Sequence, residues 1–192
     1  MKLKKYIMMV LFLSLFLTAC GQGKIEPTMS SQVEDFEFTT QDGDTLSLND
    51  LKGQWWIADF IFTNCTTVCL PMTSNMVQLQ AKLKEANLDE VQLISFTVDP
   101  ERDSPEVLKE YAESYGADLS NWTFLTGYDF ERIQEFSYNS FMSMVQKDPN
   151  SDQVGHTVRF FLINPEGEII KSSRGDQYDQ MDVIVEDLKK VF

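Results

Sequence analysis

Basic side chains are scarce in this sequence. Its 192 residues contain 16 lysines and arginines against 30 aspartates and glutamates, which gives a formal net charge of −14. Because the affinity of proteins for nucleic acids comes largely from the neutralisation of phosphates, this balance excludes a nucleic-acid partner. Such a surface could attract cations or a basic partner, although an excess of acid usually means only a soluble surface.

Long apolar runs are also lacking. The run from Tyr6 to Thr18 falls short of the ~20 apolar residues that span a bilayer as a helix. It follows three lysines and precedes Leu17-Thr18-Ala19-Cys20, with small residues where a signal peptide is cut. We therefore predict a signal peptide over residues 1–19. Leu-Thr-Ala-Cys also resembles the bacterial lipobox, which implies a lipid on Cys20; an ordinary secreted protein or a short uncleaved anchor are the alternatives.

Removal of this peptide would make the chain more acidic. The peptide carries three lysines and no acid, so 13 basic and 30 acidic residues would remain, a formal charge of −17. Residues 20–33 are polar and aperiodic, and they predict a lipidated cysteine followed by a flexible tether. Residues 34–192 suit one domain with a substantial core and show no internal repeat. The expected location is the extracytoplasmic face of the cell membrane.

The order of predicted elements indicates an α/β fold. Apolar runs predict buried strands at 55–62 and 91–98 and shorter strands at 122–125, 158–163 and 168–172, and residues 35–48 predict a hairpin around Asp42-Gly43. Helical patterns cover about 68–86, 104–115, 129–138 and 181–188. This order predicts a central, mostly parallel sheet covered by helices, with an N-terminal β-hairpin. It also resembles a thioredoxin fold.

Cysteine and histidine are rare, and two cysteines stand together. Cys65 and Cys69 directly follow the apolar run 55–62, and Pro71 prevents a helix from beginning much before Val68. Both sulfurs should therefore lie near free backbone N–H groups at the start of a helix, where the thiolate form is favoured. The pair could be a structural disulfide, a redox-active pair or part of a metal site. As a staple, so short a loop would contribute only about 2 kcal/mol.

His156 is the single histidine of the chain, just before the strand predicted at 158–163. By spacing alone, a lone histidine is more often a surface or turn residue. In a thioredoxin-like fold, however, the loop entering that strand faces the cysteine-bearing helix start. Two thiolates and one imidazole would suit copper, because soft thiolates select Cu(I) or Zn and imidazole binds copper well.

Three segments together resemble the Sco/SenC family: Cys-x-x-x-Cys after "ADFIFTN", then "SFTVDPERDSPEVLKEYA", then Val-Gly-His before a strand. The resemblance runs from about Val33 to the C-terminus. It implies a thioredoxin-like, membrane-tethered copper protein with ligands Cys65, Cys69 and His156. It also implies a role in assembling the dinuclear copper centre of cytochrome c oxidase subunit II.

The sequence departs from that family at three positions. Thr66 and Leu70 stand where a proline commonly follows each cysteine, and Gly155 stands where many members have an acid. The ligands themselves are present. The departures bear on the rigidity of the cysteine loop and on its redox potential.

Some neighbouring residues invite two interpretations each. Asp99 could orient His156 or tune a copper site through its charge, but a strand-ending Asp-Pro turn explains it equally well. Asp59 lies within a buried strand and needs a polar partner. Met72 and Met76 could offer soft thioethers to Cu(I), but their helical spacing favours packing in the core. Met142 and Met144 could form a patch of soft ligands on a loop, and packing is again favoured.

Three functions remain open at this stage. The first is a lipid-anchored copper metallochaperone. The second is a thiol–disulfide oxidoreductase that reduces the copper-ligand cysteines of the acceptor, with Cys65 attacking and Cys69 resolving. The third is an adhesion or solute-binding lipoprotein with inert cysteines. The sequence does not name the upstream copper donor.

Overall fold

A computed structural model of the chain describes residues 24–67 and 69–192. The predicted signal peptide and Cys20, the predicted lipidation site, lie outside these residues. Within them, no helix combines the length and the apolar character needed to cross a membrane.

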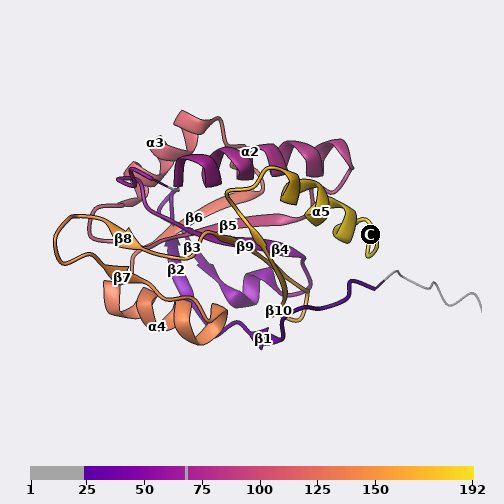
Figure 1. Cartoon of the computed structure of the whole chain (residues 1–192), viewed down its shortest axis with the longest axis horizontal. Coiled ribbons are helices and arrows are strands. Elements are labelled where there is room, and N and C mark those ends of the chain that lie inside the picture. Colours follow the sequence, from indigo (N-terminus) through magenta and orange to yellow (C-terminus); the bar gives the residue numbers. More distant parts are fainter. Residues whose placement is uncertain (1–23, 68) are drawn as a thin grey trace, which may run out of the picture.

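A mixed eight-stranded sheet forms the centre of the molecule (Figure 1). In spatial order its strands are β1 (Ser31–Gln32), β10 (Glu168–Arg174), β9 (Arg159–Ile163), β4 (Trp56–Ile61), β5 (Gln92–Thr97), β6 (Trp122–Thr126), β2 (Glu37–Thr40) and β3 (Thr45–Ser47). The α/β class and the N-terminal hairpin, β2–β3, are confirmed.

The expectation of a mostly parallel sheet is wrong. Only the pairs β4–β5 and β5–β6 are parallel, and the other five neighbouring pairs of this sheet are antiparallel. The reason lies at the two edges. The hairpins β2–β3 and β9–β10 extend a three-stranded parallel centre in both directions, and a hairpin can pair its own strands only antiparallel.

Helices cover both faces of the sheet (Figure 1). Helices α2 (Cys69–Glu85), α3 (Pro105–Tyr115) and α5 (Asp179–Leu188) lie on one face, and α4 (Phe130–Phe141) lies on the other. A short 3-10 helix, η1 (Leu48–Leu51), follows β3. The boundaries of α3 follow local rules: Ser104 accepts the N–H of Val107 at its start, and Gly116 ends it with φ 72°.

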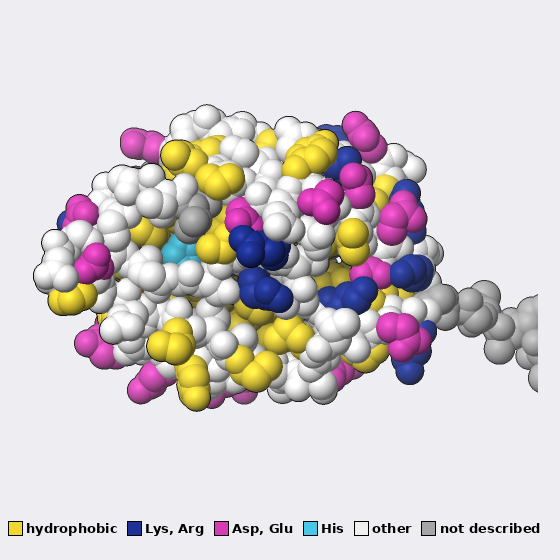
Figure 2. Space-filling model, in the orientation of Figure 1, with side chains coloured by type: hydrophobic (Ala, Val, Ile, Leu, Met, Phe, Trp, Pro, Cys, Tyr) yellow, Lys and Arg dark blue, Asp and Glu magenta, His cyan; other side chains and the backbone are white. Residues whose placement is uncertain are grey.

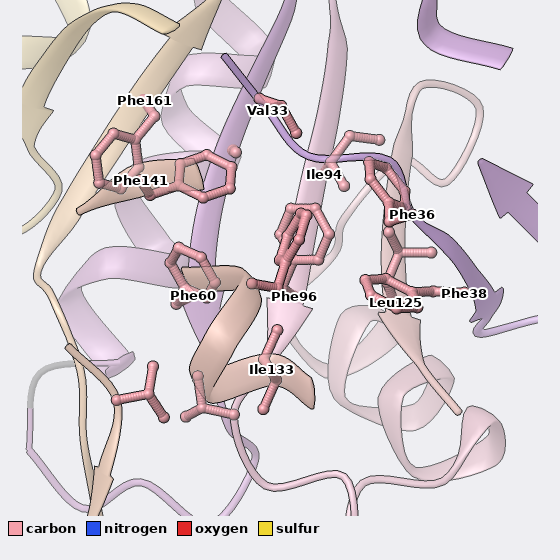
Figure 3. Close-up of a cluster of buried hydrophobic side chains, with 14 of the residues drawn as sticks. Val33, Phe36, Phe38, Phe60, Ile94, Phe96, Leu125, Ile133, Phe141 and Phe161 are labelled. Atoms are coloured by element: carbon pink, nitrogen blue, oxygen red, sulfur yellow. The ribbon is translucent and has the colours of Figure 1, made fainter. Parts of the chain in front are cut away.

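Alternation along the strands divides the core into two layers. On the α4 side, aromatic rings form a continuous cluster in which Phe60 and Phe96 lie between Phe141 and Phe36 (Figure 3). The ring centroids of Phe60 and Phe96 are 5.6 Å apart, and Phe141 meets Phe60 edge to face at 5.2 Å. Stacked and edge-to-face pairs of this kind add to the energy of area burial.

The second layer packs the α2 side of the sheet. Met72 and Met76 are fully buried there with other side chains of α2, so their predicted packing role is confirmed. Met142 and Met144 are instead 63% and 70% exposed, and the packing role predicted for them is wrong. Both follow the end of α4 and alternate with Ser143 and Val145, which are buried, so the methionine side chains take the outward positions.

The segment before β2 is not the free tether that we predicted for residues 20–33. In its described part, Ile25 and Val33 are only 4% and 2% exposed. The N–H groups of Thr28 and Met29 donate to the carbonyl of Ile170, and β1 pairs with β10. The segment is polar on average, but its few apolar side chains, including Ile25 and Val33, are buried against the domain.

A second, two-stranded sheet lies outside the main one. It consists of β7 (Gln146–Lys147) and β8 (Val154–Gly155), which pair antiparallel between α4 and β9. His156 follows β8 directly. The only histidine of the chain therefore lies at the end of a ribbon that has no backbone pairing with the main sheet.

Because Ile25 is buried, Ile25→Ala should lower the free energy of unfolding by about 2 kcal/mol or more. The neighbouring Glu26→Ala is the matched control: Glu26 is exposed, and we expect a change within ~0.5 kcal/mol. Urea unfolding followed by tryptophan fluorescence measures both. Equal, negligible effects of the two substitutions would mean that this segment is a tether after all.

Candidate metal centre

The two cysteines lie at the carboxyl end of the central strand β4. Cys65 sits in the loop after β4, where its N–H donates to the carbonyl of Phe62 at 3.3 Å. Cys69 is the first residue of α2 and is 1% exposed, whereas Cys65 is half-buried. Both cysteines are free thiols.

The structure brings His156 to the cysteines, as predicted. Its Nε2 lies 3.4 Å from Sγ of Cys69. The two sulfurs and the imidazole nitrogen all lie within 4.8 Å of one another. The pairing of β9 with β4 explains this meeting: β9 runs antiparallel to β4, so the residues that precede β9 lie beside the residues that follow β4.

The orientation of the imidazole leaves one nitrogen available. Nδ1 of His156 lies 2.9 Å from the carbonyl oxygen of Thr157, so Nδ1 carries the proton and donates it. Nε2 therefore offers a lone pair toward the cysteines. The ring of Phe62 packs edge-on against the imidazole at 5.8 Å. Figure 2 shows the histidine, in cyan, in a recess of the surface.

The two thiols have opposite acidities. Sγ of Cys65 accepts the backbone N–H of Cys69 at 3.3 Å. Hydrogen bonding from the Cys69 thiol, with help from the backbone N–H groups of Thr67 and Cys69, holds the pKa of Cys65 well below that of an ordinary thiol. The neighbouring Cys65 and burial raise the pKa of Cys69. Cys65 is thus the thiolate of the pair at neutral pH, as the helix start predicted. The same prediction for Cys69 is wrong, because burial and the neighbouring Cys65 favour its neutral thiol.

Asp59 is buried in β4, and Ser95 is the partner that the sequence could not name. The hydroxyl of Ser95 donates to Oδ1 of Asp59 at 2.6 Å, and the indole N–H of Trp122 donates to that hydroxyl at 2.9 Å. Within the described residues, Oδ2 of Asp59 has no hydrogen-bond partner. Burial raises the pKa of Asp59 to about 7, against the opposing effects of Ser95 and His156.

Asp99 does not reach the histidine in this structure. It is buried at the end of β5, its backbone N–H donates to the hydroxyl of Thr97, and its carboxylate lies 3.5 Å from Nε of Arg102. Burial and the nearby Asp103 raise its pKa. Its described contacts therefore support the turn interpretation rather than direct orientation of His156.

Asp103 is a supporting residue that sequence reasoning missed. It stands just before helix α3, where an acid is commonly favoured by the helix dipole, but its side chain is fully buried. Its carboxylate accepts the hydroxyl of Thr63 at 2.5 Å and the N–H of Thr63 at 3.2 Å, and it also accepts the hydroxyl of Thr97. It therefore fixes the start of the cysteine loop. Only the contact with Thr63, 40 positions away, reveals this role.

The site opens to solvent on one side. A hollow of about 570 Å³ lies between the cysteine loop and the β7–β8 ribbon, and Cys65, His156, Phe62, Lys147 and Val158 are among its lining residues. A small ion or the side chain of another protein can therefore reach Cys65, while Cys69 is covered.

Comparisons with known proteins place the chain in a family. The family model described as SCO1/SenC matches residues 26–192. The SCO1 protein homolog of Bacillus subtilis (strain 168) is 47% identical over 175 residues, which cover 91% of this chain and 90% of that protein.

Solved structures agree with this match. BsSco, a member of the Sco family of cytochrome c oxidase assembly proteins with an identified disulfide switch, aligns with a TM-score of 0.79 and 46% identity. The alignment covers 88% of this chain and 96% of BsSco. Yeast Sco1 with copper bound aligns with a TM-score of 0.69 and 26% identity over 83% and 89% of the two chains. The mixed α/β fold is thus similar to Sco structures, and its thioredoxin-like class is confirmed.

The acidities predict selective alkylation. In the reduced, metal-free protein, iodoacetamide should modify Cys65 well before Cys69, because the thiolate reacts and Cys65 is also the accessible thiol. The midpoint of the pH dependence should lie well below the ~8.5 of an ordinary thiol. Mass spectrometry of quenched samples measures both rates. The urea-unfolded protein is the control, in which both thiols should react alike; the same result in the folded protein would contradict the assignment.

The raised pKa of Asp59 leads us to predict that the free energy of unfolding depends on pH. Its pKa is raised above its ordinary value, so the native state binds this proton more tightly than the unfolded chain. The stability that this bound proton contributes is fully present below about pH 4 and is lost as the pH rises through about 7. Asp59→Asn removes this loss and should unfold less readily than the unmodified protein at pH 8, by up to ~4 kcal/mol.

Urea unfolding at pH 4, 6 and 8 tests this prediction. The advantage of Asp59→Asn should shrink toward pH 4, and exposed Asp89→Asn should show no comparable trend. A constant difference between Asp59→Asn and the unmodified protein at all three pH values would show that the carboxyl is not held in its neutral form.

Proposed function

This chain belongs to the SCO1/SenC family, and we propose that it is a membrane-anchored copper metallochaperone that helps to assemble the dinuclear copper centre of cytochrome c oxidase subunit II. One observation carries the proposal: Cys65, Cys69 and His156 present two sulfurs and one free imidazole nitrogen within 4.8 Å of one another. Soft thiolates with an imidazole are a donor set that copper prefers. The copper-bound structure of yeast Sco1, a relative in fold and sequence, supports the same metal.

The donors would serve the two oxidation states differently. Cu(I) would be held mainly by the two sulfurs, since it favours soft thiolates. Cu(II) would recruit Nε2 of His156, whose lone pair already points toward the sulfurs. A water or another oxygen ligand would complete that site.

Delivery would proceed by exchange of ligands. The hollow beside Cys65 gives an acceptor thiolate access to the ion from the exposed side, while buried Cys69 remains shielded. The acceptor would take over the ion one ligand at a time, so that free copper is never released. A link to cytochrome c oxidase is supported by BsSco, which belongs to a family of oxidase assembly proteins.

The proposed location rests on the sequence. Leu17-Thr18-Ala19-Cys20 would direct cleavage and lipidation at Cys20 and would hold the domain at the extracytoplasmic face of the cell membrane. Because Ile25 packs on the domain, only residues 21–24 would separate it from the lipidated cysteine. The site would then work close to the membrane surface.

The asymmetric thiols also favour a second candidate, a thiol–disulfide oxidoreductase. The Cys65 thiolate would attack a disulfide of the acceptor and form a mixed disulfide, releasing one acceptor thiolate. Cys69 would lose its proton and attack Cys65, which releases the second acceptor thiolate and leaves a Cys65–Cys69 disulfide. The acceptor gains the two electrons that the pair loses. The low pKa of Cys65 and the disulfide switch of BsSco support this candidate.

An anaerobic copper titration of the reduced soluble protein, residues 21–192, tests the proposal. We expect one Cu(II) per chain with sulfur-to-copper charge-transfer absorption, abolished by Cys65→Ala and altered by His156→Ala in absorption and electron paramagnetic resonance. Met142→Leu controls for exposed thioethers and should change nothing. Oxidation of the pair without a bound copper signal, and without Cu(I) binding, would contradict the metallochaperone and favour the oxidoreductase.

The two candidates also differ in their need for the histidine. If the protein carries copper, a strain with His156→Ala should lose most of its oxidase activity, and added copper should restore part of it. If the protein only reduces the acceptor, His156→Ala should retain nearly full activity while Cys65→Ala abolishes it. Oxidase activity of membranes, normalised to the amount of oxidase subunit, distinguishes these outcomes.

A further inference from the structure

The side-chain amide of Gln153 bonds to the backbone of the cysteine loop at two points. Its Nε2 donates to the carbonyl of Asn64 at 3.0 Å. Its Oε1 accepts the N–H of Thr66 at 3.2 Å and also the hydroxyl of Thr66 at 3.3 Å. Since a carbonyl must accept and an N–H must donate, these partners fix which end of the amide points where.

The two backbone groups lie on either side of Cys65. Asn64 precedes the cysteine and Thr66 follows it, so one amide pairs with the loop as a neighbouring strand would. Gln153 itself stands three residues before His156 and directly before β8. One half-buried side chain thus joins the segment that carries the imidazole to the segment that carries the thiolate.

The other described links between the ribbon and the body of the domain run through side chains. Nδ2 of Asn64 donates to Oδ2 of Asp152 at 2.8 Å at an exposed position, and Nζ of Lys147 lies 4.6 Å from the ring centroid of Phe130. Lys147 pairs with Glu101 at 2.9 Å, and Arg102 pairs with Asp152 at 3.0 Å, but all four side chains are exposed. Ion pairs at such positions contribute little because solvent and salt screen them. The amide of Gln153 instead holds specific backbone groups in a defined register.

We propose that Gln153 is a positioning residue that clamps the cysteine loop to the histidine segment, so that His156 and the two sulfurs are in place before an ion arrives. The role deepens the proposed function and rests on it. From the opposite side, Asp103 holds Thr63. The loop is therefore held at Thr63, Asn64 and Thr66, and binding does not have to order the backbone around Cys65.

The clamp requires an N–H at position 66. A proline there could not donate to Gln153, and its ring would fix the backbone angle instead. From the sequence alone, Thr66 in place of a proline left the rigidity of the loop open. The structure shows that the N–H of Thr66 bonds to Gln153, which restrains the loop in another way. Thr66→Pro should break the same contact as a change of Gln153.

The first test uses the reduced, metal-free protein and does not depend on copper. Gln153→Ala should raise the rate of amide hydrogen exchange at Thr66 by tenfold or more, because that N–H loses its acceptor. Gln153→Glu should retain most of the protection, since a carboxylate still accepts. Gln146→Ala is the matched control: Gln146 is exposed on the same ribbon, and its side chain makes no hydrogen bond within the described residues. Unchanged exchange in Gln153→Ala would overturn the clamp.

The second test asks what the clamp does for the site. Gln153→Ala should weaken Cu(II) binding at least tenfold and weaken the histidine signature in electron paramagnetic resonance, while Cu(I) affinity falls less than about threefold. Thr66→Pro should add little to Gln153→Ala, because both remove one contact. Equal losses for both ions, together with a lower urea midpoint, would show a merely structural role and overturn the proposal.

The two tests separate two kinds of failure. If the unmodified protein binds no copper but Gln153→Ala exposes the amide of Thr66, the proposed function fails and the clamp stands. If copper binds normally in Gln153→Ala and the histidine signature is unchanged, the positioning role fails and the metal site stands.

Discussion

The antiparallel pairing of β9 with β4 is the constraint on which the site depends. Ile57 lies opposite Leu162 and Ala58 opposite Phe161 in this pair. The beginning of β9 therefore lies beside the end of β4, and His156 meets the cysteines. If β9 ran parallel to β4, the histidine would enter at the other end of the strand, roughly 17 Å away for five residues. The parallel pair β4–β5 alone could not build this set of ligands.

Around that meeting point, the fold combines rigid support with one open side. Asp103 holds the start of the cysteine loop, Gln153 holds the backbone on either side of Cys65, and Cys69 is buried at the start of α2. Of the three ligands, Cys65 and His156 line the hollow, and Cys69 does not. A partner can therefore approach one sulfur without disturbing the other ligands. The same arrangement suits the transfer of an ion and the attack on a disulfide, since both begin at an accessible thiolate.

The thiol pair and Asp59 also affect one another. The buried carboxyl, when charged, raises the pKa of Cys69. The protonation of Asp59 and that of the thiol pair are therefore coupled, because burial leaves little water between them to screen their charges. Any ion that binds the sulfurs must displace the remaining thiol proton, so binding and protonation are linked at this site.

The sequence by itself determined what local rules control. Buried strands at β4 and β5, the cap and end of α3 and the cysteines at the start of α2 follow from apolar runs, Ser104, Gly116 and Pro71. His156 could be assigned to the cysteines only by analogy of fold. The tertiary structure decided the rest: the antiparallel edges, the packing of Ile25, the burial of Asp103 and the contact of Gln153 with Thr66. These depend on residues far apart in the chain, and no local pattern of charge or hydrophobicity encodes which partners will meet.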